Sequence, residues 1–165
     1  MSLHQAFRAG FVRRWHTNPE LAHTNDRIDG HSGRVARIIL MLHPSPSVEL
    51  LRAALIHDDG ESVVGDIPGP YKFCLKNSDC WIISNDEDRA LESIWDRGAD
   101  LRWIDDPSDQ NWLSFADRLD AYMWAQHHAP SVLIGDGWPD ARAWLEGQAI
   151  ALGVSDHLHQ TIGGV

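Results

Sequence analysis

The residues whose types and spacing suit chemistry lie around His57 and Asp58, in the stretch 55–68. Adjacent residues on a helix point about 100° apart, so both side chains reach one point only if it lies off the helix flank, as a metal ion would. Glu61 lies four residues after His57 and would share its helix face. Asp66 follows a predicted turn. Taken alone, this stretch is equally compatible with a solvated acidic helix end.

Two distant residues favour the metal site. His31 stands at the start of an apolar helix expected over residues 32–43, and Asp117 lies beside the apolar stripe of a long helix expected to begin at Asp106. A carboxylate beside buried apolar residues needs a positive partner, and a divalent ion would supply one. The predicted ligands are His31, His57, Asp58 and Asp117. They combine nitrogen and oxygen donors, which suits zinc, cobalt, manganese or iron better than calcium.

The order of a His, then His-Asp, then a distant Asp resembles the HD-domain phosphohydrolases. HDxxE followed by GDxP, with Arg-Trp upstream of the first His, is similar to the bacterial 5′-deoxynucleotidases and the related phage dATP triphosphohydrolases. The resemblance covers about residues 11–125. It implies an HD-domain helical bundle with one divalent transition metal ion, zinc, cobalt or manganese. His43, His127 and His128 fall outside the positions of the dinuclear members, which favours a mononuclear site.

The resemblance also implies roles for residues outside the metal set. Glu61 and Asp66 correspond to the catalytic carboxylates, one protonating the 5′ oxygen that leaves and the other positioning or deprotonating water, with their order left open. Arg14 resembles a phosphate-binding arginine, and Trp15 an aromatic residue that leaves no room for a 2′ hydroxyl. Lys72 would be a further phosphate contact. From the sequence alone, Arg14 is equally well a solvated helix residue and Asp66 an ordinary turn residue.

The predicted activity is hydrolysis of the 5′ phosphoester of a deoxynucleotide, with dATP or another dNTP giving deoxynucleoside and triphosphate. The triphosphate is favoured because the short chain and its Arg-Trp-His-Thr-Asn-Pro segment look more like the phage enzymes. A 5′-deoxynucleotidase acting on dNMPs is the first alternative. A non-catalytic nucleotide sensor that keeps the metal-binding core is the second, and a purely structural helical module is the third.

The length, composition and charge of the chain limit the classes of protein to which it can belong. The chain has 165 residues, of which 43% are hydrophobic, which suits one domain over residues 1–165. The net charge of −10 argues against binding polymeric nucleic acid, because counterion release needs a basic surface. We find no membrane-length apolar run and no signal peptide, so we expect a cytoplasmic protein of a bacterium or a phage-infected host.

The cysteines and tryptophans allow two further predictions. Cys74 and Cys80 fit neither a disulfide framework nor a metal-type CxxC pair and are expected to be free thiols. Of the 8 tryptophans, all except Trp15 are expected in the core and at subunit contacts, in a homo-oligomer.

Helical spacing and capping signals predict an all-α domain of about six helices. The polar segment 16–30, which carries His23 and Asp26, is expected to be irregular and to wrap toward the site. Residues 81–83 are apolar enough for a short strand, though three residues do not decide it. The expected helices cover 2–15, 32–43, 48–60 with Ser47 as its cap, a segment capped by Ser84 and closed by Gly98, one from Asp106-Pro107, one from Pro139 to near Gly153, and a last turn capped by Ser155.

Overall fold

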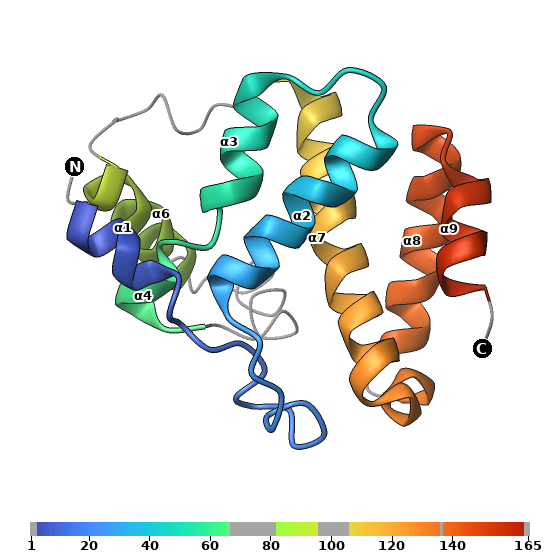
Figure 1. The fold of residues 1–165 in the computed structure, drawn as a ribbon, viewed down its shortest axis with the longest axis horizontal. Coiled ribbons are helices and arrows are strands. Elements are labelled where there is room, and N and C mark those ends of the chain that lie inside the picture. The colour runs from blue at the N-terminus through green and yellow to red at the C-terminus, as the bar shows by residue number, and fades with distance from the viewer. Residues whose placement is uncertain (1–2, 67–81, 96–105, 136, 164–165) are drawn as a thin grey trace. The chain divides into compact units, whose positions relative to one another are not determined.

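The computed structural model describes residues 3–66, 82–95, 106–135 and 137–163. Regular structure in these residues is helical, and their only β-type pairing is an isolated bridge between Arg13 and Arg27. The all-α fold class is therefore confirmed (Figure 1). In chain order the described helices are α1 (Leu3–Ala9), α2 (Ile28–Leu42), α3 (Val48–Ile56), α4 (Glu61–Val64), α6 (Ile82–Trp95), α7 (Pro107–His128), the 3₁₀ helix η2 (Pro130–Ile134), α8 (Trp138–Leu152) and α9 (Ser155–Ile162).

The chain forms two compact units, and the first comprises residues 1–32 and 55–103. Helices α1, α4 and α6 pack on one another in this unit (Figure 1). It also contains the first residues of α2 and the last two of α3. Its buried apolar residues include Ala9, Leu21, Ile28, Ala90 and Ile94. This first unit carries most of the predicted site.

The second unit comprises residues 33–54 and 104–165. Helix α8 packs against α7 and α9, and η2 contacts α7 and α8. The predicted start of α7 is confirmed, because the Asp106 carboxylate accepts a hydrogen bond from Ser108 N at 2.8 Å with Pro107 in the first turn. The predicted end of α8 is confirmed too, since Gly153 adopts a left-handed φ of 73°. One domain over residues 1–165 stays a prediction.

Several predicted boundaries were wrong near the site. The helix expected over 2–15 ends at Ala9, because Val12 and Arg14 make backbone hydrogen bonds with residues 26–28 instead of continuing the helix. A Cβ at Gly10 would lie 2.9 Å from the Asp29 Cβ, so glycine permits this close approach. The helix expected over 32–43 begins earlier, at Ile28.

Further boundaries shift in the later segments. The helix expected over 48–60 ends at Ile56. The strand considered for residues 81–83 is not formed, because Ile82 begins α6, and this start also precedes the predicted Ser84 cap. Ser155 lies in the first turn of α9 rather than capping it. Gly98, the expected end of α6, lies outside the described residues, as do Cys74 and Cys80.

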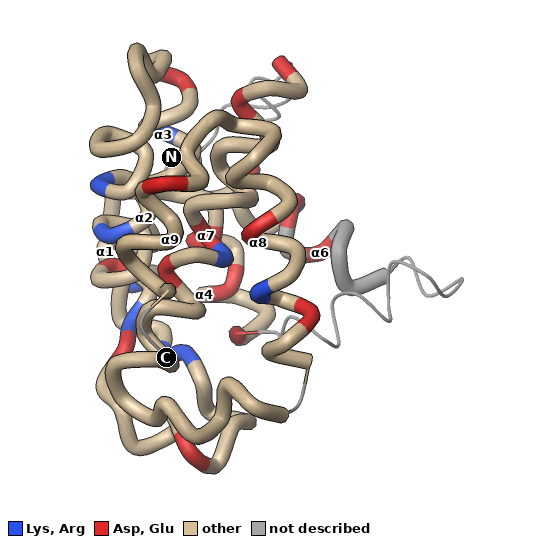
Figure 2. Tube along the Cα trace, turned by 90° about the vertical axis from the view of Figure 1, so that its right-hand side faces the viewer, with Lys and Arg blue, Asp and Glu red and all other residues tan. Residues whose placement is uncertain are grey.

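Charge is distributed along the chain rather than gathered in one segment. The sequence holds 24 acidic and 14 basic residues, and the acidic positions are spread over the described helices and loops (Figure 2). None of the described helices combines the length and apolar character needed to cross a bilayer.

Candidate metal centre

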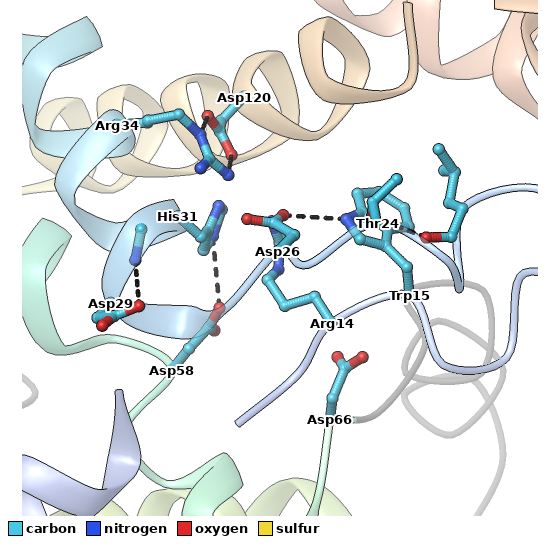
Figure 3. Close-up of polar contacts among 12 residues, drawn as sticks. Arg14, Trp15, Thr24, Asp26, Asp29, His31, Arg34, Asp58, Asp66 and Asp120 are labelled. Carbon is cyan, nitrogen blue, oxygen red and sulfur yellow. Dashed lines mark hydrogen bonds and ion pairs between the residues drawn. The ribbon is translucent and has the colours of Figure 1, made fainter. Parts of the chain in front are cut away.

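Three side chains of the first unit converge although they come from two separate segments. His31 lies in the first turns of α2 and is fully buried, while His57 and Asp58 follow the end of α3. The Asp58 carboxylate lies 3.4 Å from His31 Nε2 and 3.5 Å from His57 Nε2. The two imidazole rings are 5.3 Å apart. Figure 3 shows His31 and Asp58 directed toward each other.

The spacing of these donors fits a metal ion. Zinc bonds to histidine nitrogen and carboxylate oxygen at about 2.0–2.2 Å, so neighbouring ligands in a tetrahedral site lie about 3.4 Å apart. The two measured nitrogen–oxygen distances match this value. One donor atom from each residue lies within 4.8 Å of the others. The His31–His57–Asp58 cluster can therefore hold a metal ion.

The local backbone that presents this cluster differs from the prediction. His57 and Asp58 were expected on a continuous helix with Glu61 over the same site, but α3 ends at Ile56 and α4 begins at Glu61. The four intervening residues form successive turns, in which Glu61 N donates to Asp58 O at 3.0 Å. Glu61 is nevertheless buried at the start of α4. The spacing of His57 and Glu61 therefore arises from turns rather than from one helix face.

The predicted fourth ligand, Asp117, lies on α7 in the second unit. Its pairing with the cluster therefore stays a prediction. The neighbouring carboxylate, Asp120, is buried and accepts two hydrogen bonds from Arg34, at 2.6 and 3.1 Å. Arg34 also lies over the Trp124 ring, at 4.3 Å. The bidentate ion pair with Arg34 argues against Asp120 as the fourth ligand.

Arg14 and Trp15 lie in an irregular segment of the first unit, not on the predicted helix. Both side chains donate to one oxygen of Asp26, Arg14 Nη1 at 3.1 Å and Trp15 Nε1 at 3.0 Å (Figure 3). Asp26 is only 1% exposed. The alternative of a solvated helix position for Arg14 is therefore excluded, because its guanidinium is part-buried and paired.

Asp66 also has a specific partner. His16 Nδ1 lies 3.2 Å from the Asp66 carboxylate, and Asp66 is largely buried. The preceding Gly65 has a φ of 85°, which confirms the predicted turn because residues other than glycine rarely adopt this conformation. Asp66 is thus more than a solvated turn residue. Lys72, the predicted phosphate contact, lies outside the described residues.

Asp59 was not among the predicted site residues. It is 6% exposed, and the Trp95 indole on α6 donates a hydrogen bond to its carboxylate at 2.9 Å. Burial raises the pKa of Asp59 to about 6, against a lowering by the Trp95 hydrogen bond and by His57. Asp59, with a pKa of about 6, therefore follows directly in the chain after His57 and Asp58, two of the candidate metal ligands.

Three residues near the site, Asp26, His16 and Asp59, were not predicted as site residues, and the sequence indicated them to different degrees. Asp26 was noted in a polar segment expected to wrap toward the site, but nothing identified its partners. His16 stands beside Trp15 without a motif of its own. Asp59 is the second acidic residue of the run Asp58-Asp59-Gly60-Glu61, and this local pattern does not distinguish a buried carboxylate from a solvated one. Each role depends on a contact between residues distant in the chain.

Comparison of the chain with protein-family models, with curated proteins and with solved structures gave no match. The resemblance to HD-domain phosphohydrolases therefore rests on the ordered motif. In the first unit, His31, His57 and Asp58 form a group that could hold a metal ion.

Proposed function

We propose that this protein is a metal-dependent phosphohydrolase that cleaves the 5′ phosphoester of deoxynucleotides, with dATP or another dNTP as substrate and deoxynucleoside and triphosphate as products. The observation that carries the proposal is the convergence of His31, His57 and Asp58 at metal-ligand distances. These are the residues that the ordered motif predicts as ligands.

The donor set favours one divalent transition metal ion, zinc, cobalt or manganese. His31, His57 and Asp58 would hold it, with Asp117 as the fourth protein ligand. When bound, such an ion offsets the negative charge on the phosphoryl oxygens during hydrolysis. Metal ligands must be deprotonated at their donor atoms, so binding of the ion should weaken in acid.

Arg14 and Trp15 would recognise the substrate. A guanidinium can contact a carboxylate and a phosphate at once because it carries five N–H donors, so the Asp26 pair is compatible with phosphate binding. Trp15 would pack on the sugar and exclude a 2′ hydroxyl. A hydroxyl forced against an indole ring loses water without gaining a hydrogen bond, which selects deoxyribose.

Glu61 and Asp66 would handle the protons. A nucleoside 5′ alkoxide is a poor leaving group, so one carboxyl group must protonate it while another positions or deprotonates the attacking water. Glu61 is buried, and Asp66 is paired with His16. The proposal does not divide the acid and base roles between these two residues.

One experiment separates the candidate functions. The purified protein is analysed for bound metal and then incubated with each dNMP, dNTP and rNTP, with phosphate, pyrophosphate and triphosphate measured separately. Release of triphosphate from dNTPs supports the proposal. Release of phosphate from dNMPs alone would identify a 5′-deoxynucleotidase instead. Bound metal and nucleotide without any turnover would identify a sensor, and absence of bound metal would leave only a structural module.

A further inference from the structure

We propose that Asp26 is a positioning residue that holds Arg14 and Trp15 as one rigid recognition element. The inference rests on the proposed function for its consequence on nucleotide selection, while its geometric part concerns this chain alone. Asp26 lies on neither the metal cluster nor the HDxxE and GDxP motifs. Its role would be to act on substrate through its two neighbours.

The geometry of Asp26 supports this role. A single carboxylate oxygen, Oδ2, accepts from the Arg14 guanidinium and from the Trp15 indole. The Asp26 side chain is 1% exposed, and burying an ionised carboxylate is unfavourable unless charged or strongly polar donors surround it. Charge-assisted hydrogen bonds are the shorter and stronger ones. The two donors are therefore held in one fixed arrangement.

The backbone reinforces the arrangement. Trp15 has a φ of 67°, the left-handed region that bulky residues rarely occupy, so the surrounding contacts must maintain it. Arg14 N donates to Asp26 O at 3.2 Å, and Arg13 forms a β-type bridge with Arg27. Asp26 thus binds residue 14 through both its backbone and its side chain. The Arg14 guanidinium also lies 5.2 Å from the Trp15 ring centroid.

This arrangement determines what a substitution would do. A ring that excludes a 2′ hydroxyl works only if it does not move aside, because a small displacement creates the missing space. Asp26→Asn keeps one acceptor oxygen but removes the charge, so the hydrogen bonds from Arg14 and Trp15 lose their charge assistance and hold the indole less firmly. We therefore expect Asp26→Asn to admit ribonucleotides, lowering the ratio of dATP to ATP turnover by about tenfold. The KM for both nucleotides should rise as the Arg14 contact loosens.

The test uses two readouts on the full-length protein. The first is the NMR resonance of the Trp15 indole N–H, recognised as the signal that disappears in Trp15→Phe. The second is kcat and KM for dATP and ATP, together with metal content. Asp29→Asn is the matched control, because Asp29 also pairs with an arginine, Arg27, at 3.2 Å, and its side chain accepts hydrogen bonds from Arg27 and Gly30 rather than from residue 14 or 15.

We expect Asp26→Asn to move the indole signal and lower the dATP to ATP ratio, with metal content unchanged, and Asp29→Asn to alter neither. An unmoved indole signal, or an unchanged ratio, overturns the inference while the phosphohydrolase function stands. If the wild-type protein hydrolyses no nucleotide, the proposed function fails, and a moved indole signal still upholds Asp26 as the residue that positions Trp15. Should Asp26→Asn not fold, Trp15→Phe replaces it. That variant keeps an aromatic ring without the donor, and an unchanged ratio in it refutes the role of the Asp26 bond.

Discussion

Replacing Asp59 with asparagine should change how the stability of the metal-free protein depends on pH. Burial raises the pKa of Asp59 from 3.8 to about 6, so the folded state binds a proton more tightly than the unfolded state. The stabilising contribution of protonated Asp59 is complete below pH 4 and is lost as the pH rises through 6. A shift of about two pKa units corresponds to about 3 kcal/mol, at 1.36 kcal/mol per unit.

Asparagine has nearly the same shape, accepts the Trp95 hydrogen bond and does not titrate. The free energy of unfolding of Asp59→Asn relative to wild type should therefore increase by about 3 kcal/mol between pH 4 and pH 7. Urea unfolding in the presence of a chelator, at intervals across this range, measures the difference. Asp88→Asn is the control, because it removes the same charge from an exposed position on α6.

Two further measurements connect this titration with its surroundings. Trp95→Phe should enlarge the pH dependence, since the indole hydrogen bond lowers the Asp59 pKa. Saturation with zinc should reduce it, because a cation held by His57 and Asp58 favours the ionised form of the adjacent carboxylate. Parallel curves for wild type and Asp59→Asn from pH 4 to pH 7 would refute the reasoning.

The remaining predictions concern the proposed activity. Glu61→Ala and Asp66→Asn should keep the metal and bind dATP but lose roughly 10²-fold or more in kcat, and near-normal turnover in both would refute their catalytic roles. Trp15→Ala should raise turnover of ATP relative to dATP, whereas Arg14→Ala should weaken both nucleotides equally; an unchanged ratio in Trp15→Ala would make this residue packing only. Alanine at any one of the predicted ligands, His31, His57, Asp58 or Asp117, should remove metal and turnover together, measured by metal analysis and product assay. Full metal content would remove that residue from the ligand set.

Local patterns were sufficient for the elements that short-range chemistry determines. Ser47 accepts a hydrogen bond from Leu50 N at 2.9 Å and so caps α3 as its position predicted. The Asp106-Pro107 start of α7 and the Gly153 end of α8 followed from the same kind of signal. Helical spacing of apolar residues was enough for the all-α class, because amphipathic helices need no distant partner to be recognised.

The sequence by itself determined the order of chemical groups, His31, His57-Asp58, Glu61 and Asp66, and hence which residues to examine. Only the tertiary structure decided that His31 meets Asp58, that α1 ends at Ala9, and that Asp26 joins Arg14 to Trp15. These outcomes depend on hydrogen bonds and burial between segments far apart in the chain. The periodicity of apolar residues reports secondary structure over a few neighbouring residues. It does not indicate which distant carboxylate will accept a hydrogen bond from a buried donor.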